Sequence, residues 1–135
     1  GIMVTADGPK VLEFNCRLGD PEAQPLLMRL QSDLLELCQA TLSQTLDQQN
    51  PQWYAGTALG VVLAAGGYPQ SYKKGLTIHG LNNTFDDDCK VFHAGTRQDG
   101  SHIYTDGGRV LCVCARGDSL TVAQQKAYAM SDKIY

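Results

Sequence analysis

Five short apolar segments separated by glycine-rich turns fill most of the second half of the chain, and they constrain its fold more than any other feature. Short runs rich in β-branched and aromatic residues and bounded by glycine are typical of strands joined by tight turns. The sequence therefore predicts an antiparallel sheet. Its strands are expected at residues 57–65, 76–78, 90–94, 102–104 and 109–115.

A helical pattern follows the last of these segments. Ser119 is a favourable N-cap residue, and apolar side chains then recur along one stripe. The stripe consists of Leu120, Ala123, Ala127, Met130 and Ile134. We predict a final helix with one apolar face.

The first part of the chain has a different pattern. Two apolar runs within residues 1–15 flank Asp7-Gly8-Pro9, which predicts a β-hairpin. Asp20-Pro21-Glu22 is typical of a helix start, with aspartate as N-cap and proline in the first turn. One helix ending near Thr45 is expected to bury a leucine stripe. The stripe consists of Leu27, Leu30, Leu34, Leu37 and Leu42.

The segment 46–56 lacks apolar periodicity and contains Asn50-Pro51, so it is interpreted as a connector. We predict an α+β fold with a boundary there. Residues 1–48 form one unit, and residues 49–135 form a small second domain with an antiparallel sheet and a helix.

Length and composition exclude several classes of protein. The 135 residues are 43% hydrophobic, which is enough for a core. The formal charge is −3 and the 11 basic residues are dispersed, so we predict no nucleic-acid binding. No apolar run approaches the length of a membrane span, and we predict no membrane association. A soluble cytoplasmic protein is expected.

The cysteine pattern supports the same expectation. The count of five is odd, and none of the cysteines has CxxC spacing. Free, mostly buried thiols in a reducing compartment are therefore predicted, in preference to disulfides or a zinc site.

The segment 11–24, VLEFNCRLGDPEAQ, carries the clearest chemical signal. Side chains two residues apart on a strand share a face, so Glu13, Asn15 and Arg17 are expected to be neighbours. Carboxylate and amide oxygens suit Mg²⁺, which takes few protein ligands and completes its shell with phosphate and water. A guanidinium beside them suits phosphoryl or carboxylate oxygens.

Simpler interpretations exist for each of these side chains. Glu13 and Asn15 can be solvated at an exposed edge, and Arg17 can form an ion pair with Asp20 or Glu22. Asp20 can be only a helix N-cap. The functional alternative is that Asp20 holds a substrate ammonium group near the helix N-terminus.

Two glycine-rich turns carry further cations, Lys74 within residues 66–75 and Arg109 at the end of residues 106–109. The first does not match the GxxxxGK[ST] phosphate-binding loop, so a structural turn with solvated lysines is the simpler interpretation. An ordinary surface arginine is the simpler one for Arg109. The run 86–88 is interpreted as a solvated acidic loop. No metal is assigned to the histidines, which share no ligand spacing: His79, His93 and His102.

Four motifs taken together resemble the phosphoribosylamine–glycine ligase family of ATP-grasp enzymes. They are VLEFNCRLGDPEAQ, GGYPQSYKKG, VFHAGT and GGRVLCVCARGDSL, in this order. The resemblance implies a fragment that contains the end of an ATP-grasp domain and the small C-terminal domain. One residue departs from the family pattern, because Leu18 stands where an aromatic side chain is expected.

The resemblance also implies an activity. The family joins glycine to 5-phosphoribosylamine with ATP, in purine biosynthesis, through a glycyl phosphate. It implies that Glu13 and Asn15 bind Mg²⁺ or Mn²⁺, and this chemistry fits Arg17 as the catalytic side chain. It gives Lys74 and Arg109 roles in substrate binding, in addition to the substrate-binding role already considered for Asp20. The alternatives are a non-catalytic accessory domain and a small module that binds a sugar phosphate.

Overall fold

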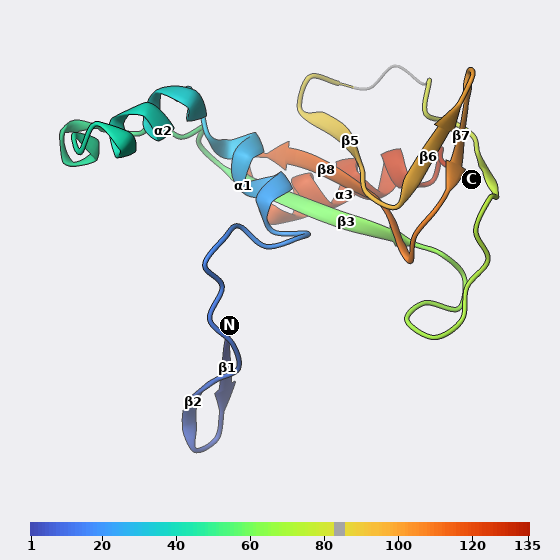
Figure 1. The fold of residues 1–135 in the computed structure, drawn as a ribbon, viewed down its shortest axis with the longest axis horizontal. Coiled ribbons are helices and arrows are strands. Elements are labelled where there is room, and N and C mark those ends of the chain that lie inside the picture. The colour runs from blue at the N-terminus through green and yellow to red at the C-terminus, as the bar shows by residue number, and fades with distance from the viewer. Residues whose placement is uncertain (83–85) are drawn as a thin grey trace.

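The computed structural model describes residues 1–82 and 86–135, and its centre is a three-stranded antiparallel sheet with the order β3-β8-β5 (Figure 1). The strands are β3 (Thr57–Ala64), β8 (Arg109–Gly117) and β5 (Cys89–His93). The middle strand is the most deeply buried element, and Val113, Cys114 and Ala115 have no exposed surface. The predicted α+β fold is confirmed.

Helix α3 (Leu120–Ser131) packs on this sheet as the apolar stripe predicts. Ser119 caps it, because its hydroxyl accepts a 3.3 Å hydrogen bond from the backbone N–H of Val122. Three members of the stripe are buried: Ala123, Ala127 and Met130. Leu120 is mostly exposed, and the helix ends before Ile134.

A second antiparallel sheet has the order β4-β7-β6. Its strands are β4 (Thr77–Ile78), β7 (His102–Thr105) and β6 (Thr96–Asp99). Strand β6 was not predicted because its sequence, TRQD, contains no apolar residue. It forms a hairpin with β7 through a tight turn in which Gly100 has a positive φ.

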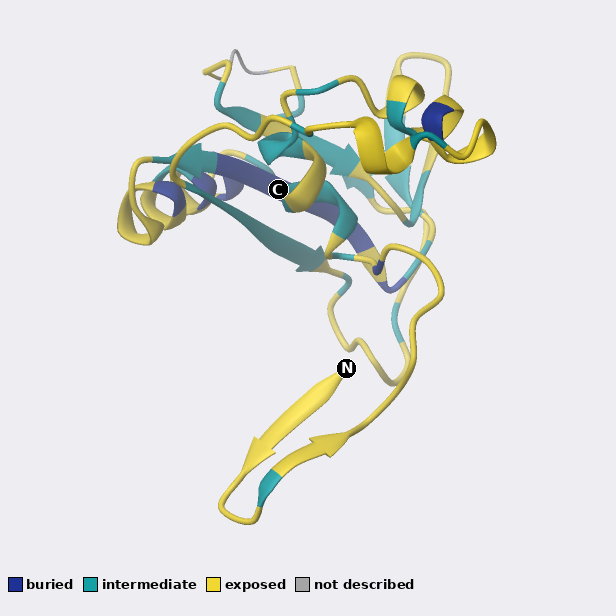
Figure 2. Ribbon diagram, turned by 90° about the vertical axis from the view of Figure 1, so that its left-hand side faces the viewer, coloured by how far each residue is buried: buried dark blue, intermediate teal, exposed yellow. Residues whose placement is uncertain are grey.

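The N-terminal hairpin consists of β1 (Ile2–Thr5) and β2 (Gly8–Val11) and extends away from the rest of the molecule (Figure 1). Its residues are almost all exposed (Figure 2). Thr5 pairs with Gly8, which has a positive φ of 98° beside the turn. The second strand ends at Val11, so the segment that carries Glu13 is not part of the hairpin.

The prediction of one long helix after Asp20 was wrong, because the structure has α1 (Ala23–Arg29) and α2 (Leu34–Leu42). Leu30 is extended and forms an isolated β-bridge with Trp53. A new cap then starts α2, because the Asp33 side chain accepts a 2.7 Å hydrogen bond from the N–H of Leu35. Asp33 followed by Glu36 resembles a capping box, a signal that the leucine spacing concealed.

The leucine stripe is not a buried face in this structure. Leu27, Leu34 and Leu42 are exposed, and Leu42 retains 86% of its surface. Helix α1 itself packs on β3 and β8, and the short 3-10 helix η1 (Leu46–Gln48) follows α2. The boundary after residue 48 stays a prediction. Within the described residues, no helix is long and apolar enough to cross a membrane.

All five cysteines are free thiols. Cys112 and Cys114 are buried on β8, as predicted, and their sulfurs lie 3.6 Å apart. Burial raises the pKa of both thiols, which favours their protonated form. Cys16 and Cys38 are exposed, which corrects the prediction of burial for these two.

Candidate functional site

Glu13 and Asn15 lie in contact in an exposed segment without regular secondary structure. The Asn15 amide nitrogen donates a 3.1 Å hydrogen bond to Oε1 of Glu13. The predicted shared strand face is not formed, because β2 ends at Val11. A direct side-chain hydrogen bond brings the two groups together instead.

This pair fits a Mg²⁺ or Mn²⁺ ion that is bound mainly through substrate phosphates. A carboxylate and an amide supply hard oxygen ligands, and a half-turn of the Asn15 amide would present its oxygen beside that of Glu13. Both side chains are open to solvent. Among the described residues there is no cluster of three or more His, Cys, Asp or Glu side chains that could hold a metal alone.

Arg17 is exposed and lies in the same segment as Glu13 and Asn15. Its guanidinium donates a 3.3 Å hydrogen bond to the carbonyl of the next residue, Leu18. Within the part of the chain that the structure describes, Arg17 forms no ion pair, so the alternative interpretation of an ion pair with Asp20 or Glu22 is not observed. Most of its donors are available to a ligand.

Asp20 is held by two side chains and is not the N-cap of α1. The N-cap position is Glu22, which makes no side-chain capping bond. One Asp20 oxygen accepts a 2.8 Å hydrogen bond from Gln24, and the other lies 3.4 Å from the Arg109 guanidinium. Arg109 also donates a 3.0 Å hydrogen bond to the Asp20 backbone carbonyl. The structure thus pairs two residues that were predicted separately, 89 positions apart.

Lys74, the third predicted substrate ligand, reaches the turn that carries Arg109. Its ammonium lies 3.5 Å from Asp106, and both side chains are about half exposed. Such a pair contributes about 0 to 1 kcal/mol, so a ligand anion could replace Asp106 at little cost. The structure therefore brings Lys74, Asp20 and Arg109 to one turn, residues 106–109.

A cavity of about 500 Å³ lies beside this turn. The neighbouring lysine, Lys73, lines it, and Lys74 does not. The other lining residues are Gly66, Ser71, Tyr72 and Leu76. The loop is packed and not merely solvated, because Tyr68 and Tyr72 lie against Gly108, where a Cβ would come within 2.3 Å of the Tyr68 ring.

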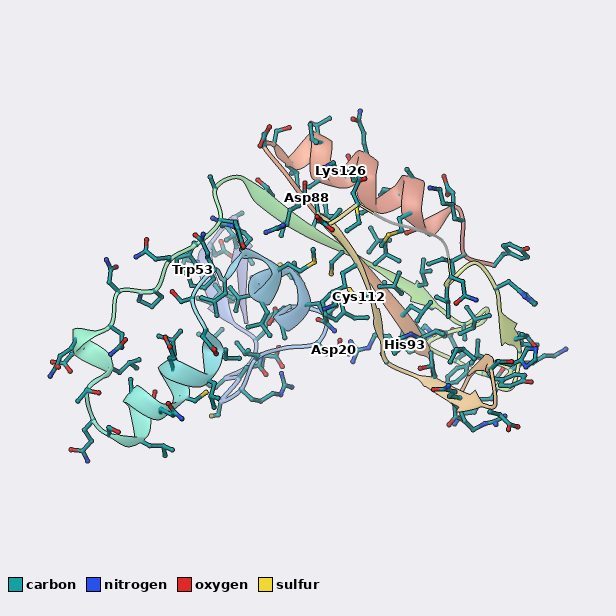
Figure 3. All side chains as sticks on the ribbon, turned by 90° about the horizontal axis from the view of Figure 1, so that it is seen from above. Asp20, Trp53, Asp88, His93, Cys112 and Lys126 are labelled. Carbon is teal, nitrogen blue, oxygen red and sulfur yellow. The ribbon has the colours of Figure 1, made fainter. Side chains whose placement is uncertain are left out.

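A second polar cluster was missed by the sequence analysis, which assigned residues 86–88 to a solvated loop. Asp88 accepts hydrogen bonds from Arg116 at 2.9 Å and from Lys126 at 3.0 Å. Figure 3 shows Asp88 and Lys126 together beside α3, away from Asp20. The Lys126 hydrogen bond lowers the pKa of Asp88, and the same bond raises the pKa of Lys126.

Tyr54 completes this cluster and joins it to α1. The Arg116 guanidinium stacks on the Tyr54 ring and donates a 3.5 Å hydrogen bond to the Met28 carbonyl. A cavity of about 270 Å³ lies alongside Tyr54 and Arg116. No local sequence spacing could have found this cluster, because its members come from four separate segments.

A family model described as phosphoribosylglycinamide synthetase, C domain, matches residues 58–135, which is more than half of the chain. The chain belongs to this synthetase C-domain family. The matched residues run from the second residue of β3 to the end of the chain and include α3, the Lys74 loop and the turn that ends at Arg109. The resemblance inferred from the four motifs is confirmed.

Similarity to curated relatives extends over the whole chain. The phosphoribosylamine–glycine ligases of Allochromatium vinosum and Vibrio cholerae are 60% and 53% identical, over 99% and 100% of this chain. A crystal structure of phosphoribosylamine–glycine ligase from Thermotoga maritima superimposes with a TM-score of 0.71 at 31% identity and covers 100% of this chain. The chain spans about a third of the length of these relatives, 32% and 33%.

Proposed function

We propose that this chain forms part of a phosphoribosylamine–glycine ligase, which joins glycine to 5-phosphoribosylamine at the expense of ATP in purine biosynthesis. The names of its relatives support this proposal, as does its membership of the synthetase C-domain family. Because those relatives are about three times as long, the remaining ATP-binding groups are expected outside these 135 residues. A cytoplasmic location fits five free cysteines.

The observation that carries the proposal is the contact between Glu13 and Asn15 beside Arg17. Two oxygen-bearing side chains 3.1 Å apart and a guanidinium that forms no ion pair within the described residues suit a phosphoryl-transfer site. All three lie in an exposed segment that substrates can approach. A bound Mg²⁺ or Mn²⁺ would neutralise phosphate charge there.

The proposed reaction has two steps. The glycine carboxylate attacks the γ-phosphorus of ATP, which gives glycyl phosphate and ADP. The phosphoribosylamine nitrogen then attacks the glycyl carbonyl, expels inorganic phosphate and loses a proton to give glycinamide ribonucleotide. We assign to Arg17 the stabilisation of negative charge on the transferring phosphoryl group or on the glycine carboxylate.

Further substrate contacts are proposed at the turn 106–109. Lys74 is a candidate for the phosphate of phosphoribosylamine, because its present partner, Asp106, is an exposed carboxylate that an anion can replace. Asp20 and Arg109 are the other two side chains that the sequence analysis assigned to substrate binding. They are paired with each other, and this ion pair would have to open for either of them to contact a substrate.

The experiment is an assay of ADP formation by the longer protein that contains this chain. ADP should form only when glycine is present, and glycinamide ribonucleotide should accumulate only when phosphoribosylamine is also added. The 135-residue chain alone is the control and should form no ADP. ADP formation that is independent of glycine would contradict the proposal, and no ADP formation by the longer protein would favour a non-catalytic accessory domain.

A further inference from the structure

We propose that Arg109 is a positioning residue that fixes the segment carrying Glu13, Asn15 and Arg17, and that it acts through Asp20 without contacting a substrate. This inference rests on the proposed ligase function. It replaces the substrate-binding role that the sequence suggested for Arg109.

Arg109 contacts Asp20 at two points, and this double contact is termed the grip. One guanidinium nitrogen of Arg109 donates to the Asp20 backbone carbonyl at 3.0 Å, and another lies 3.4 Å from the Asp20 carboxylate. The second carboxylate oxygen of Asp20 accepts the Gln24 hydrogen bond. Asp20 therefore has its main chain and its side chain engaged, which suits a fixed point better than a ligand for an incoming ammonium group.

Arg109 is itself part of a rigid frame at the end of the central sheet. Its carbonyl accepts a 2.8 Å hydrogen bond from Gly95, and the Gly108 carbonyl accepts one from Ala65 at 2.8 Å. The backbones of Gly95 and Gly107 pack so closely that a Cβ on Gly95 would lie 2.5 Å from the Gly107 Cα. The Arg109 side chain thus extends from a backbone that is held on several sides.

The segment on the other side of the grip has few constraints of its own. Among the described residues, positions 14–18 form no backbone–backbone hydrogen bond, and their side chains are exposed. Regular bonding resumes at Gly19, whose carbonyl accepts hydrogen bonds from Glu22 and Ala23. The grip at Asp20 therefore ties the candidate metal and phosphoryl ligands to the C-terminal sheet.

This arrangement predicts that a variant without Arg109 is impaired in kcat more than in its KM for the substrates. A displacement of about 1 Å in a reacting group can cost about a hundredfold in rate. Loss of Arg109 should therefore lower kcat and weaken metal binding, because Glu13 and Asn15 are released together. A direct substrate contact would instead act mainly on the KM of the substrate it binds.

The test uses the longer ligase that contains this chain, with Arg109→Met, Arg109→Lys, Asp20→Ala and the Asp20→Ala/Arg109→Met double variant. Arg97→Met is the matched control, since Arg97 also pairs with an exposed aspartate, at 3.7 Å, but lies on β6. Three quantities are measured: kcat, the KM of phosphoribosylamine, and the Kd of Mn²⁺ in the presence of a non-hydrolysable ATP analogue, by electron paramagnetic resonance.

We expect Arg109→Met to lower kcat and raise the Mn²⁺ Kd by about tenfold each, with a change in KM below about threefold. Arg109→Lys should show the same changes to a smaller extent, and Arg97→Met should show none. The kcat of the double variant should be no more than about twofold below that of the less active single variant, because both substitutions remove the same contact between Asp20 and Arg109.

Three results would overturn the inference and leave the proposed ligase function in place. The first is a tenfold rise in the KM of phosphoribosylamine with an unchanged Mn²⁺ Kd. The second is a loss in the double variant that equals the product of the two single losses. The third is an active ligase in which Arg109→Met behaves like the wild type. A wild-type protein without glycine-dependent ADP formation would instead remove the proposed ligase function.

Discussion

Arg116 on β8 stacks on Tyr54 in the connecting segment, with its guanidinium carbon 4.2 Å from the ring centroid. The same group donates hydrogen bonds to Met28 in α1 and to Asp88 before β5. One side chain thus joins the first part of the chain to the central sheet. Because Arg116 is only 21% exposed, these contacts are poorly screened by solvent.

Arg116→Lys should lower the free energy of unfolding of the 135-residue chain by about 1 to 3 kcal/mol. Lysine keeps the charge but cannot stack as a plane and donate to two acceptors at once. Urea denaturation measures the difference. The control is Arg97→Lys, which alters a half-exposed arginine over Tyr104 and should cost less than about 0.5 kcal/mol. An equal loss of unfolding free energy in the two variants would show that the contacts of Arg116 stabilise the fold no more than those of an exposed arginine.

The Asp88 cluster predicts an acid-sensitive contribution to stability. The hydrogen bond from Lys126 lowers the pKa of Asp88, and partial burial opposes this shift without reversing it. A lowered folded-state pKa means that the contribution is fully present above the unfolded value, about 3.9, and is lost as pH falls through the folded value. Asp88→Asn should therefore lower the melting temperature at pH 7, and this difference should shrink as the pH falls through the folded-state pKa of Asp88.

Thermal unfolding between about pH 2 and pH 7 checks this prediction, with Asp99→Asn as the control for an exposed ion pair. The control should differ little from the wild type at every pH. A melting-temperature difference for Asp88→Asn that stays constant down to pH 2 would mean that the charge of Asp88 is not the source of its effect.

Glu13→Gln and Asn15→Ala should each raise the Mg²⁺ concentration needed for half-maximal activity of the longer ligase. Both side chains are exposed, and in the part of the chain that the structure describes their one side-chain hydrogen bond is with each other, so the melting temperature should change little. Titration of activity with Mg²⁺ and with Mn²⁺ measures the shift. Unchanged activity of both variants at limiting Mg²⁺ would remove this pair as metal ligands.

Arg17→Lys separates a role in chemistry from a role in charge alone. Lysine cannot reproduce a planar two-point contact with phosphoryl or carboxylate oxygens, so kcat of the longer ligase should fall by about a hundredfold or more at saturating ATP and glycine. The melting temperature should stay the same, because Arg17 forms no ion pair among the described residues. A lysine variant with near-normal kcat would leave the metal pair as the remaining chemistry of this segment.

Local patterns were sufficient where neighbouring residues determine the structure. Ser119 and the apolar stripe after it predicted α3, since capping and burial of one face both act within a few turns. Short apolar segments between glycine-rich turns predicted the antiparallel strands, including buried β8. The candidate metal pair was likewise found from two residues close in sequence, Glu13 and Asn15.

The sequence by itself therefore determined the α+β class, the main strands, the last helix and the family, because these depend on periodicity, caps and motifs. Only the tertiary structure decided where the long helix breaks, since Leu30 leaves the helix to pair with Trp53, 23 residues away. It also decided that Asp20 contacts Arg109 and that Asp88 contacts Lys126. Partners so distant in sequence are brought together only by packing of the sheet, and no local spacing encodes that packing.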